Sequence, residues 1–173
     1  GNFTGSAELM DAMMRDDSVA GIMDVRVKGL LGLPMLFKPV DGSGEFGSNV
    51  AAFVERNKDV FCPKDVLTEL LASAIFLGFG FAQISWEPLT KDLWAPTFEF
   101  WHPQFISYHA HDRKWRAQTL EGQVEIDMHS GQCLCIKDGE RSFMRGLVRS
   151  LGGLYLSRQH AFRDWDRWGE LYS

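Results

Sequence analysis

The pattern that decides the fold lies in DVLTELLASAIFLGFGFAQISWEP, residues 65–88. Pro63, just before it, is well placed as the first residue of a helix, where its missing N–H is not needed. Apolar residues then recur at spacings of three and four, which predicts an amphipathic helix. The stripe expected to be buried on this helix consists of Val66, Leu67, Leu70, Leu71, Ala74 and Ile75.

Gly78 and Gly80 interrupt this pattern and predict a turn from the helix into a strand. The strand is expected from Phe81 to Trp86. Polar and apolar residues alternate only weakly along it, so we expect it to be buried on both faces. Among the elements predicted in the first half of the chain, the preceding helix has the clearest pattern.

The residues before Pro63 predict further helices with polar residues at their starts. Ser6 and Ser18 are the expected N-cap residues of the first two helices, because a serine hydroxyl can accept a hydrogen bond from a free N–H of the first turn. Helices are expected over residues 7–16, 18–30 and 50–61, a strand over residues 35–40, and a flexible glycine-rich loop over residues 41–49.

Residues 93–140 contain short apolar-rich runs separated by turn signals, which predict a meander of short antiparallel strands. The runs are TFEFWHP, FISYHAH, KWRAQTLEG, QVEIDMH and CLCIKDG. Together with the helices they predict an α+β fold, in which helices surround a small mixed or antiparallel sheet.

The segment from Leu147 to Tyr172 contains no proline and predicts one long C-terminal helix of about 39 Å. Three glycines lie inside it, and each costs about 1 kcal/mol relative to alanine in a helix interior. We expect this helix to need a partner that buries its large side chains. The residues expected near one face are Leu147, Leu151, Tyr155, Phe162, Trp165, Trp168 and Tyr172.

The composition limits the classes of function. The 173 residues carry a net charge of −5, which excludes a generic basic nucleic-acid binder but not a protein that lets DNA pass without gripping it. Apolar residues make up 45% of the chain and aromatic residues 13%, enough for a sizeable core and typical of large interfaces. No apolar run reaches the about 18 residues of a membrane span, and the N-terminus has no signal-peptide pattern. The missing initial Met is consistent with a tagged, trimmed or partial chain.

The sequence offers one candidate metal site, at His109 and His111. Two histidines at alternate positions of a strand point to the same face and suit zinc or iron. No third ligand has a suitable spacing, although His102 and His129 are nearby in the sequence. We therefore predict no metal and no cofactor, and keep a metal-dependent enzyme using His109 and His111 as the alternative function.

The cysteines and small-residue loops do not predict catalysis. Cys133 and Cys135 lie two residues apart, unlike the CxxC pairs of zinc and redox sites, and an odd total of three cysteines favours a reducing, intracellular setting. The third, Cys62, precedes Pro63 and is expected at the start of a helix. No GxSxG nucleophile motif is present, so we predict no catalytic residue.

Basic residues are regularly placed in the last third of the chain, with acidic residues between them. Such residues could face DNA, but the alternation of both signs favours salt bridges between helices or subunits. The basic residues are Arg141, Arg145, Arg149, Arg158, Arg163 and Arg167.

Four segments carry a combined pattern: Leu30–Pro34 (LLGLP), Gly78–Glu87, Phe98–Phe105 and Leu151–Tyr172. In this order they resemble the Mu-type phage portal protein family, which also occurs in prophages. The resemblance implies a wing-like α+β domain over residues 1–146, followed by a helix similar to the first portal stem helix over residues 147–173. It also implies that the chain is a fragment without the clip, the second stem helix and the crown.

The resemblance further implies a structural protein and not an enzyme. Portal proteins form a ring, expected here to be dodecameric, at one capsid vertex, and double-stranded DNA passes through it during packaging and ejection without sequence-specific binding. The implied partners are further copies of the chain, the terminase, capsid proteins and head–tail connector proteins, with no membrane. The implied location is the virion, after assembly in the bacterial host cytoplasm.

We expect the C-terminal helix to form the contact between subunits. Phe162, Trp165, Trp168 and Tyr172 recur at spacings of three and four and would leave an apolar patch in water. Flanking charges would set the register between neighbouring subunits, and these are Arg158, Arg163 and Arg167. A generic module that binds a host protein stays open as a further alternative.

Overall fold

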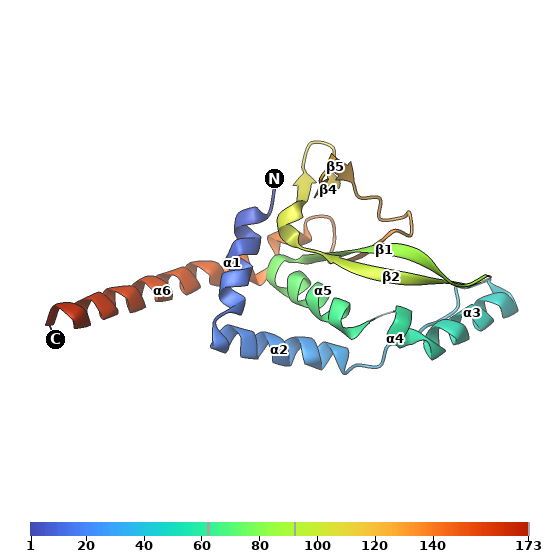
Figure 1. Cartoon of the computed structure of the whole chain (residues 1–173), viewed down its shortest axis with the longest axis horizontal. Helices are drawn as coiled ribbons and strands as arrows, with labels where there is room; N and C mark the ends of the chain where they lie inside the picture. The colour runs from blue at the N-terminus through green and yellow to red at the C-terminus, as the bar shows by residue number, and fades with distance from the viewer. Residues whose placement is uncertain (62, 92, 173) are drawn as a thin grey trace.

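The computed structural model describes residues 1–61, 63–91 and 93–172, and within them it confirms the predicted α+β fold (Figure 1). The helices are α1 (Thr4–Met14), α2 (Asp17–Leu31), α3 (Gly44–Arg56), α4 (Lys58–Phe61), α5 (Lys64–Leu77) and α6 (Leu147–Tyr172). The strands are β1 (Phe79–Thr90), β2 (Leu93–Trp101), β3 (Ile106–His109), β4 (Lys114–Thr119), β5 (Gly122–Glu125) and β6 (Cys133–Lys137). Two short 3-10 helices are η1 (Pro103–Phe105) and η2 (Ser142–Met144).

Helix α5 turns directly into β1 at Gly78, as the glycines predict. Gly78 has a φ of 84°, a left-handed conformation that favours glycine. Gly80 lies so close to α5 that a Cβ at this position would be only 2.6 Å from the carbonyl oxygen of Leu70. The buried hydroxyl of Ser73 donates a hydrogen bond to the carbonyl of Phe79 over 2.7 Å. These contacts fold the start of β1 back onto α5.

The buried face of α5 is slightly rotated from the predicted stripe. Leu70 is fully buried, as predicted, whereas Leu67, Leu71 and Ile75 are only partly buried. This rotation arises because β1 folds back along α5 and covers the side of the helix that carries Leu70. The buried residues of α5 are Leu70, Ser73, Phe76 and Leu77.

The strands form two three-stranded antiparallel sheets instead of one continuous meander. Their orders are β2-β1-β6 and β3-β4-β5. Strand β6 pairs with the first part of β1, from Phe79↔Lys137 to Gln83↔Cys133, so the meander prediction is wrong for β6. Residues 79–82 are buried, and buried backbone groups on both edges of a strand need hydrogen-bonding partners. Pairing with β6 supplies them along one edge of this stretch, and pairing with β2 supplies them along the other edge from Phe81 onward.

Beyond the part of β1 that pairs with β6, β1 and β2 continue together as a long hairpin toward the end of the molecule opposite α6, with α4 in contact with β2 (Figure 1). Residues 83–88 of β1 are mostly exposed. The prediction that this strand is buried on both faces is therefore correct only for its first third.

An aromatic cluster joins the two sheets and forms the core. Trp115 of β4 is 3% exposed, and its ring centroid lies 4.9 Å from that of Phe79 and 5.1 Å from that of Phe81, both on β1. The ring of Tyr108 on β3 lies 5.2 Å from Trp115, and the ring of Phe3 stacks on Trp115 at 5.8 Å. Aromatic pairs of this kind contribute about 0.5–1.5 kcal/mol each beyond the burial of their area.

The starts of α1 and α2 differ from the predicted capping. Ser6 lies inside α1, whose N-cap is Phe3. Ser18 lies inside α2, whose N-cap is Asp16, and Oδ1 of Asp16 accepts hydrogen bonds from the N–H groups of Ser18 and Val19 over 3.1 and 3.3 Å. A carboxylate at this position also interacts favourably with the helix dipole, which explains why the aspartate and not the serine caps α2.

The predictions for residues 35–49 are wrong. Residues 35–40 form no strand, because no strand in the described part of the chain pairs with them, and Leu36 and Val40 are largely exposed. Helix α3 already begins at Gly44, so most of the predicted glycine-rich loop is helical. Glu45 in the first turn of α3 favours this early start through the helix dipole.

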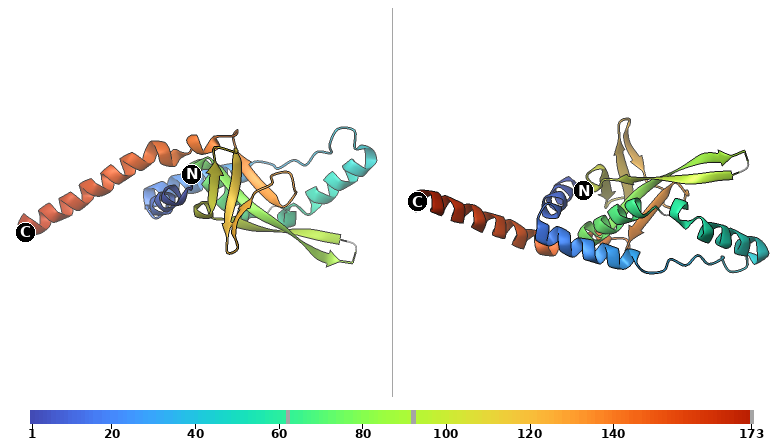
Figure 2. Two further views of the ribbon diagram at one scale, coloured as in Figure 1. Left: turned by 90° about the horizontal axis from the view of Figure 1, so that it is seen from above. Right: turned by 60° about the horizontal axis from the view of Figure 1, so that its bottom comes forward.

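Helix α6 leaves the body as one long helix, as predicted (Figure 1 and Figure 2). Val148 and Gly152 in its first half are buried, whereas residues 160–171 are all exposed. None of the helices in the described residues, α6 included, is long and apolar enough to cross a membrane.

We predict that Leu70→Ala lowers the free energy of unfolding by about 2–5 kcal/mol, because it leaves a cavity at the contact between α5 and β1. Urea unfolding followed by circular dichroism measures this change. Leu36→Ala, at a largely exposed leucine before α3, is the matched control and should cost less than about 0.5 kcal/mol. Equal losses in the two variants would contradict the packing of α5 on β1.

Candidate subunit interface

Helix α1 fixes the direction in which α6 leaves the body. Gly152 of α6 lies so close to α1 that a Cβ there would be 2.8 Å from Cδ2 of Leu9. One turn later, the hydroxyl of Tyr155 donates a hydrogen bond to the carbonyl of Ala12 over 3.0 Å. Gly152, which the sequence suggests is only a weak point of the helix, is therefore the position where the two helices approach each other.

Arg158 adds a third contact, and it lies within the same chain. Its Nη2 is 2.8 Å from Oδ2 of Asp16, the residue whose other carboxylate oxygen caps α2. The guanidinium carbon of Arg158 also lies 5.4 Å from the ring centroid of Phe162, a cation–π distance. The structure thus places Arg158 at the junction of α6 with its own body.

The outer half of α6 carries large apolar side chains that its own body does not cover. Phe162 is 56% exposed, Trp165 79% and Trp168 66%. Leu154, closer to the body, is also largely exposed. Tyr172 is the last residue of α6, and its side chain lies outside the described part of the structure. Apolar surface of this extent on one helix is typical of a protein–protein interface.

One side of α6 follows a regular 4-3 spacing. A repeat of 3.5 residues is typical of a helix that packs along another helix, because it keeps one seam facing the partner. Tyr155 lies beside this seam and not in it, because its hydroxyl contacts α1, whereas Phe162 falls outside the strict spacing but stays exposed. The seam residues are Leu147, Leu151, Leu154, Arg158, Ala161, Trp165, Trp168 and Tyr172. Sequence analysis missed Leu154 and Ala161, which the strict spacing could have identified.

The remaining predicted interface residues, Arg163 and Arg167, are exposed on α6. At 3.6 residues per turn they lie on a different side of the helix from Trp165. Of the other basic residues in this region, Arg145 pairs with Asp138 of the same chain, so part of the basic series serves intrachain contacts.

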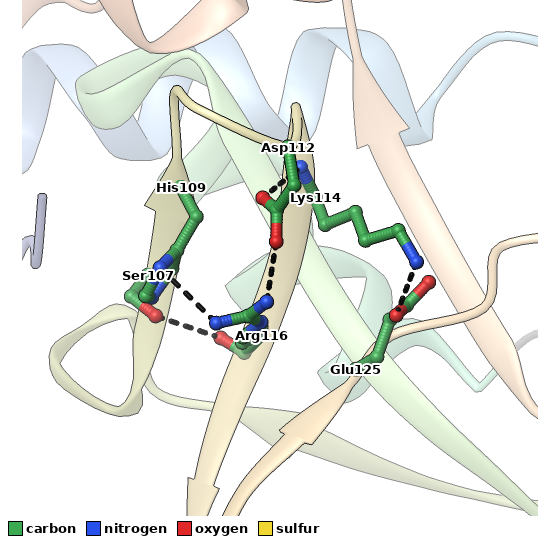
Figure 3. A network of polar contacts seen from close by, with 6 residues as sticks. All are labelled: Ser107, His109, Asp112, Lys114, Arg116 and Glu125. Atoms are coloured by element: carbon green, nitrogen blue, oxygen red, sulfur yellow. Dashed lines mark hydrogen bonds and ion pairs between the residues drawn. The ribbon is translucent and has the colours of Figure 1, made fainter.

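The candidate metal ligand His109 lies in a polar network (Figure 3). Its Nδ1 is 3.2 Å from Nη1 of Arg116, which also pairs with Asp112, and a guanidinium so close to the imidazole opposes a cation there. Loss of hydration acts to raise the pKa of Asp112, but the hydrogen bond from the Lys114 N–H and the charge of Arg116 outweigh it and leave this pKa below its ordinary value. His111 is exposed. In the described residues no group of three or more His, Cys, Asp or Glu is arranged to hold a metal.

The two described cysteines are partly buried on β6 against the core. Burial raises the pKa of the Cys133 thiol to about 11 and that of Cys135 to about 12. Both therefore stay protonated at neutral pH, whereas metal binding and nucleophilic attack need the thiolate. Cys62, predicted at a helix start, lies outside the described residues.

An open cavity of about 810 Å³ lies between the two sheets. Apolar side chains such as Phe81, Trp101 and Val124 form much of its wall, and no histidine is found among its described lining residues. Glu125, one of its two carboxylates, pairs with Lys114 over 2.7 Å. The described lining of the cavity therefore includes no histidine base for its serines.

The comparisons with known proteins agree with this structural character. A family model described as the portal protein of Mu bacteriophage matches residues 7–173, which leaves out only the first six residues. No curated protein matches the chain.

We predict that Gly152→Val lowers the free energy of unfolding by about 1–3 kcal/mol more than Gly153→Val, because only the first side chain would meet Leu9. Both changes place the same β-branched residue in the same helix, so their cost in helix propensity is the same. Thermal unfolding of the two variants measures the difference. Equal melting temperatures would mean that α6 does not lie against α1 at this position.

We also predict that excess EDTA leaves the melting temperature unchanged, because Arg116 beside His109 opposes a bound cation. Differential scanning fluorimetry before and after chelation provides the measurement. A large fall that added Zn²⁺ reverses would instead support the metal-dependent alternative at His109 and His111.

Proposed function

The chain belongs to the family of the Mu bacteriophage portal protein, and on this premise we propose that it is a subunit of a portal ring at the capsid vertex of a phage or prophage. Portal proteins are structural proteins of the phage particle that act as oligomeric rings and assemble with capsid proteins. We propose that double-stranded DNA passes through this ring during packaging and ejection.

The observation that carries the proposal is the exposed outer half of α6. Residues 160–171 of this helix are all exposed, although they include two tryptophans and a phenylalanine. A helix of this composition gains stability in water when neighbouring helices cover it. In a closed ring every subunit has a neighbour on each side, so each copy of this helix can be covered by neighbouring helices.

The exposed outer half of α6 also suggests how the chain is divided into parts. We propose that residues 1–146 form the wing and residues 147–173 the first stem helix, with the clip, second stem helix and crown encoded downstream. The body ends where α6 begins, and the described contacts of α6 with it lie in the first half of the helix. This arrangement lets the wing stay folded while the outer half of α6 contacts other subunits.

The charge of the chain supports a conduit in preference to a DNA-binding domain. Its net charge is −5, and affinity for DNA comes mostly from neutralising phosphates with basic residues. A conduit must let DNA slide, so weak attraction is favourable. We propose a dodecameric ring that docks the terminase and the head–tail connector, is assembled in the host cytoplasm and is retained in the virion.

Nothing in the described residues supports the alternative function, a metal-dependent enzyme. His109 contacts the guanidinium of Arg116, and burial keeps the thiols of Cys133 and Cys135 protonated. We therefore propose that the protein has no catalytic role of its own.

The test uses the whole protein, including any sequence that its gene encodes after Ser173. We predict that Trp165→Ser combined with Trp168→Ser abolishes rings, because it removes the two most exposed aromatic side chains described in α6. Sedimentation velocity and negative-stain micrographs detect the rings, and circular dichroism checks that the wing is folded.

Trp94→Ser is the matched control, because it removes an exposed tryptophan from β2 and should leave rings intact. Rings of normal yield in the double variant would place the subunit contact elsewhere. Absence of any ring in the unaltered protein would overturn the proposed function itself.

A further inference from the structure

Helix α6 presents two chemically different exposed sides. One, here called the aromatic stripe, consists of Leu154, Trp165 and Trp168. The other, here called the basic stripe, consists of Arg149, Arg163 and Arg167. All six residues are exposed, and the exposed Leu156 and Glu170 lie on the same side of the helix as the basic stripe. At about 100° per residue, the centres of the two stripes lie roughly 150° apart around the helix.

The basic stripe differs from the other arginines near α6 in its partners. Arg145 pairs with Asp138 and Arg158 with Asp16, so their charges are compensated within the chain. In residues 1–61, 63–91 and 93–172, no ion pair or hydrogen bond of the Arg163 or Arg167 side chain is found. These two guanidinium groups are therefore available to a partner.

The symmetry of a ring decides which sides of α6 can meet, and this step rests on the proposed function. Neighbours in a ring with more than two members make a heterologous contact, in which one side of a subunit meets a different side of the next. If the aromatic stripe met its own copy, the contact would be twofold and would stop at a dimer. A closed ring of nearly parallel helices instead needs two sides somewhat less than 180° apart, and the two stripes meet this requirement.

Rotation about the ring axis also sets the height of the contact. Because a pure rotation carries no translation along the axis, a given residue lies at the same height in every copy. Arg163 and Arg167 bracket Trp165 in the sequence, and Trp168 follows directly. The outer parts of the basic and aromatic stripes therefore lie level with each other in neighbouring copies.

We propose that Arg163 and Arg167 of one subunit stack on the indole rings of Trp165 and Trp168 of the next. Arginine is suited to this contact, because its planar guanidinium stacks on aromatic faces and holds its water weakly. The same helix already contains one such contact within the chain, between Arg158 and Phe162. The partner that covers the aromatic stripe is thus a second copy of α6, through its basic stripe.

Cysteine cross-linking in the whole protein tests the pairing. Residues 163 and 165 lie on opposite sides of one helix, so cysteines at these positions cannot bridge within a chain. Under oxidation, Arg163→Cys alone and Trp165→Cys alone should give no more cross-linked product than the parent protein, which controls for the native cysteines. The combined variant should give a ladder of covalent multimers on denaturing gels.

Other outcomes overturn the inference and distinguish it from the proposed function. Dimers from Trp165→Cys alone would show that the aromatic stripe meets its own copy. Rings in which the combined variant gives no ladder would mean that the stripes face DNA or another segment. Absence of rings in the parent protein would overturn the proposed function, and the inference with it.

A second measurement applies if the combined variant does not assemble. Arg163→Gln with Arg167→Gln should lose rings on sedimentation, whereas Arg163→Lys with Arg167→Lys should keep a reduced fraction, since lysine retains the cation but not the planar stacking. Asp164→Asn with Glu170→Gln alters charge on the same stretch and is expected to leave rings intact. Unchanged rings in the glutamine variant would overturn the proposed stacking.

Discussion

The burial of Trp115 between the two sheets is the interaction on which the rest of the body depends. Each sheet has only three strands and gains stability chiefly by packing on another element. Burying an indole ring stabilises the fold by about 4–6 kcal/mol. The Nε1 of Trp115 has no hydrogen-bond partner in the described residues, which costs about 1–3 kcal/mol, so the apolar contact with Phe79 and Phe81 outweighs the lost hydrogen bond.

This core also positions the helix that we assign to the subunit contact. Phe3 stacks on Trp115, and the bridge between Asn2 and Ser107 ties the start of the chain to β3. Helix α1 follows directly and carries Ala12, whose carbonyl accepts the hydrogen bond of Tyr155 on α6. The direction of α6 is therefore coupled to the aromatic core through one short helix. A helix held this firmly at its base can present its outer half to another subunit in a fixed orientation.

Local sequence patterns predicted the elements whose own residues are sufficient to form them. The stripe of residues 65–77 identified α5, the glycines identified the turn into β1, and the proline-free segment from Leu147 identified α6 with its bounds. The exposed tryptophans of α6 were predicted for the same reason, because helical spacing alone brings them to one region. The prediction of a strand over residues 35–40 was wrong, because a strand needs a neighbouring strand to pair with and a local pattern does not show whether one is present.

The sequence by itself determined the α+β class, the long final helix and the family pattern, since helical periodicity, turn residues and charge are properties of neighbouring positions. Only the tertiary structure decided that β6 pairs with β1, that Asp16 both caps α2 and holds Arg158, and that Tyr155 faces α1 while Trp165 faces solvent. These outcomes depend on contacts between residues far apart in the chain. These contacts stabilise the protein only after the core has brought the distant segments together.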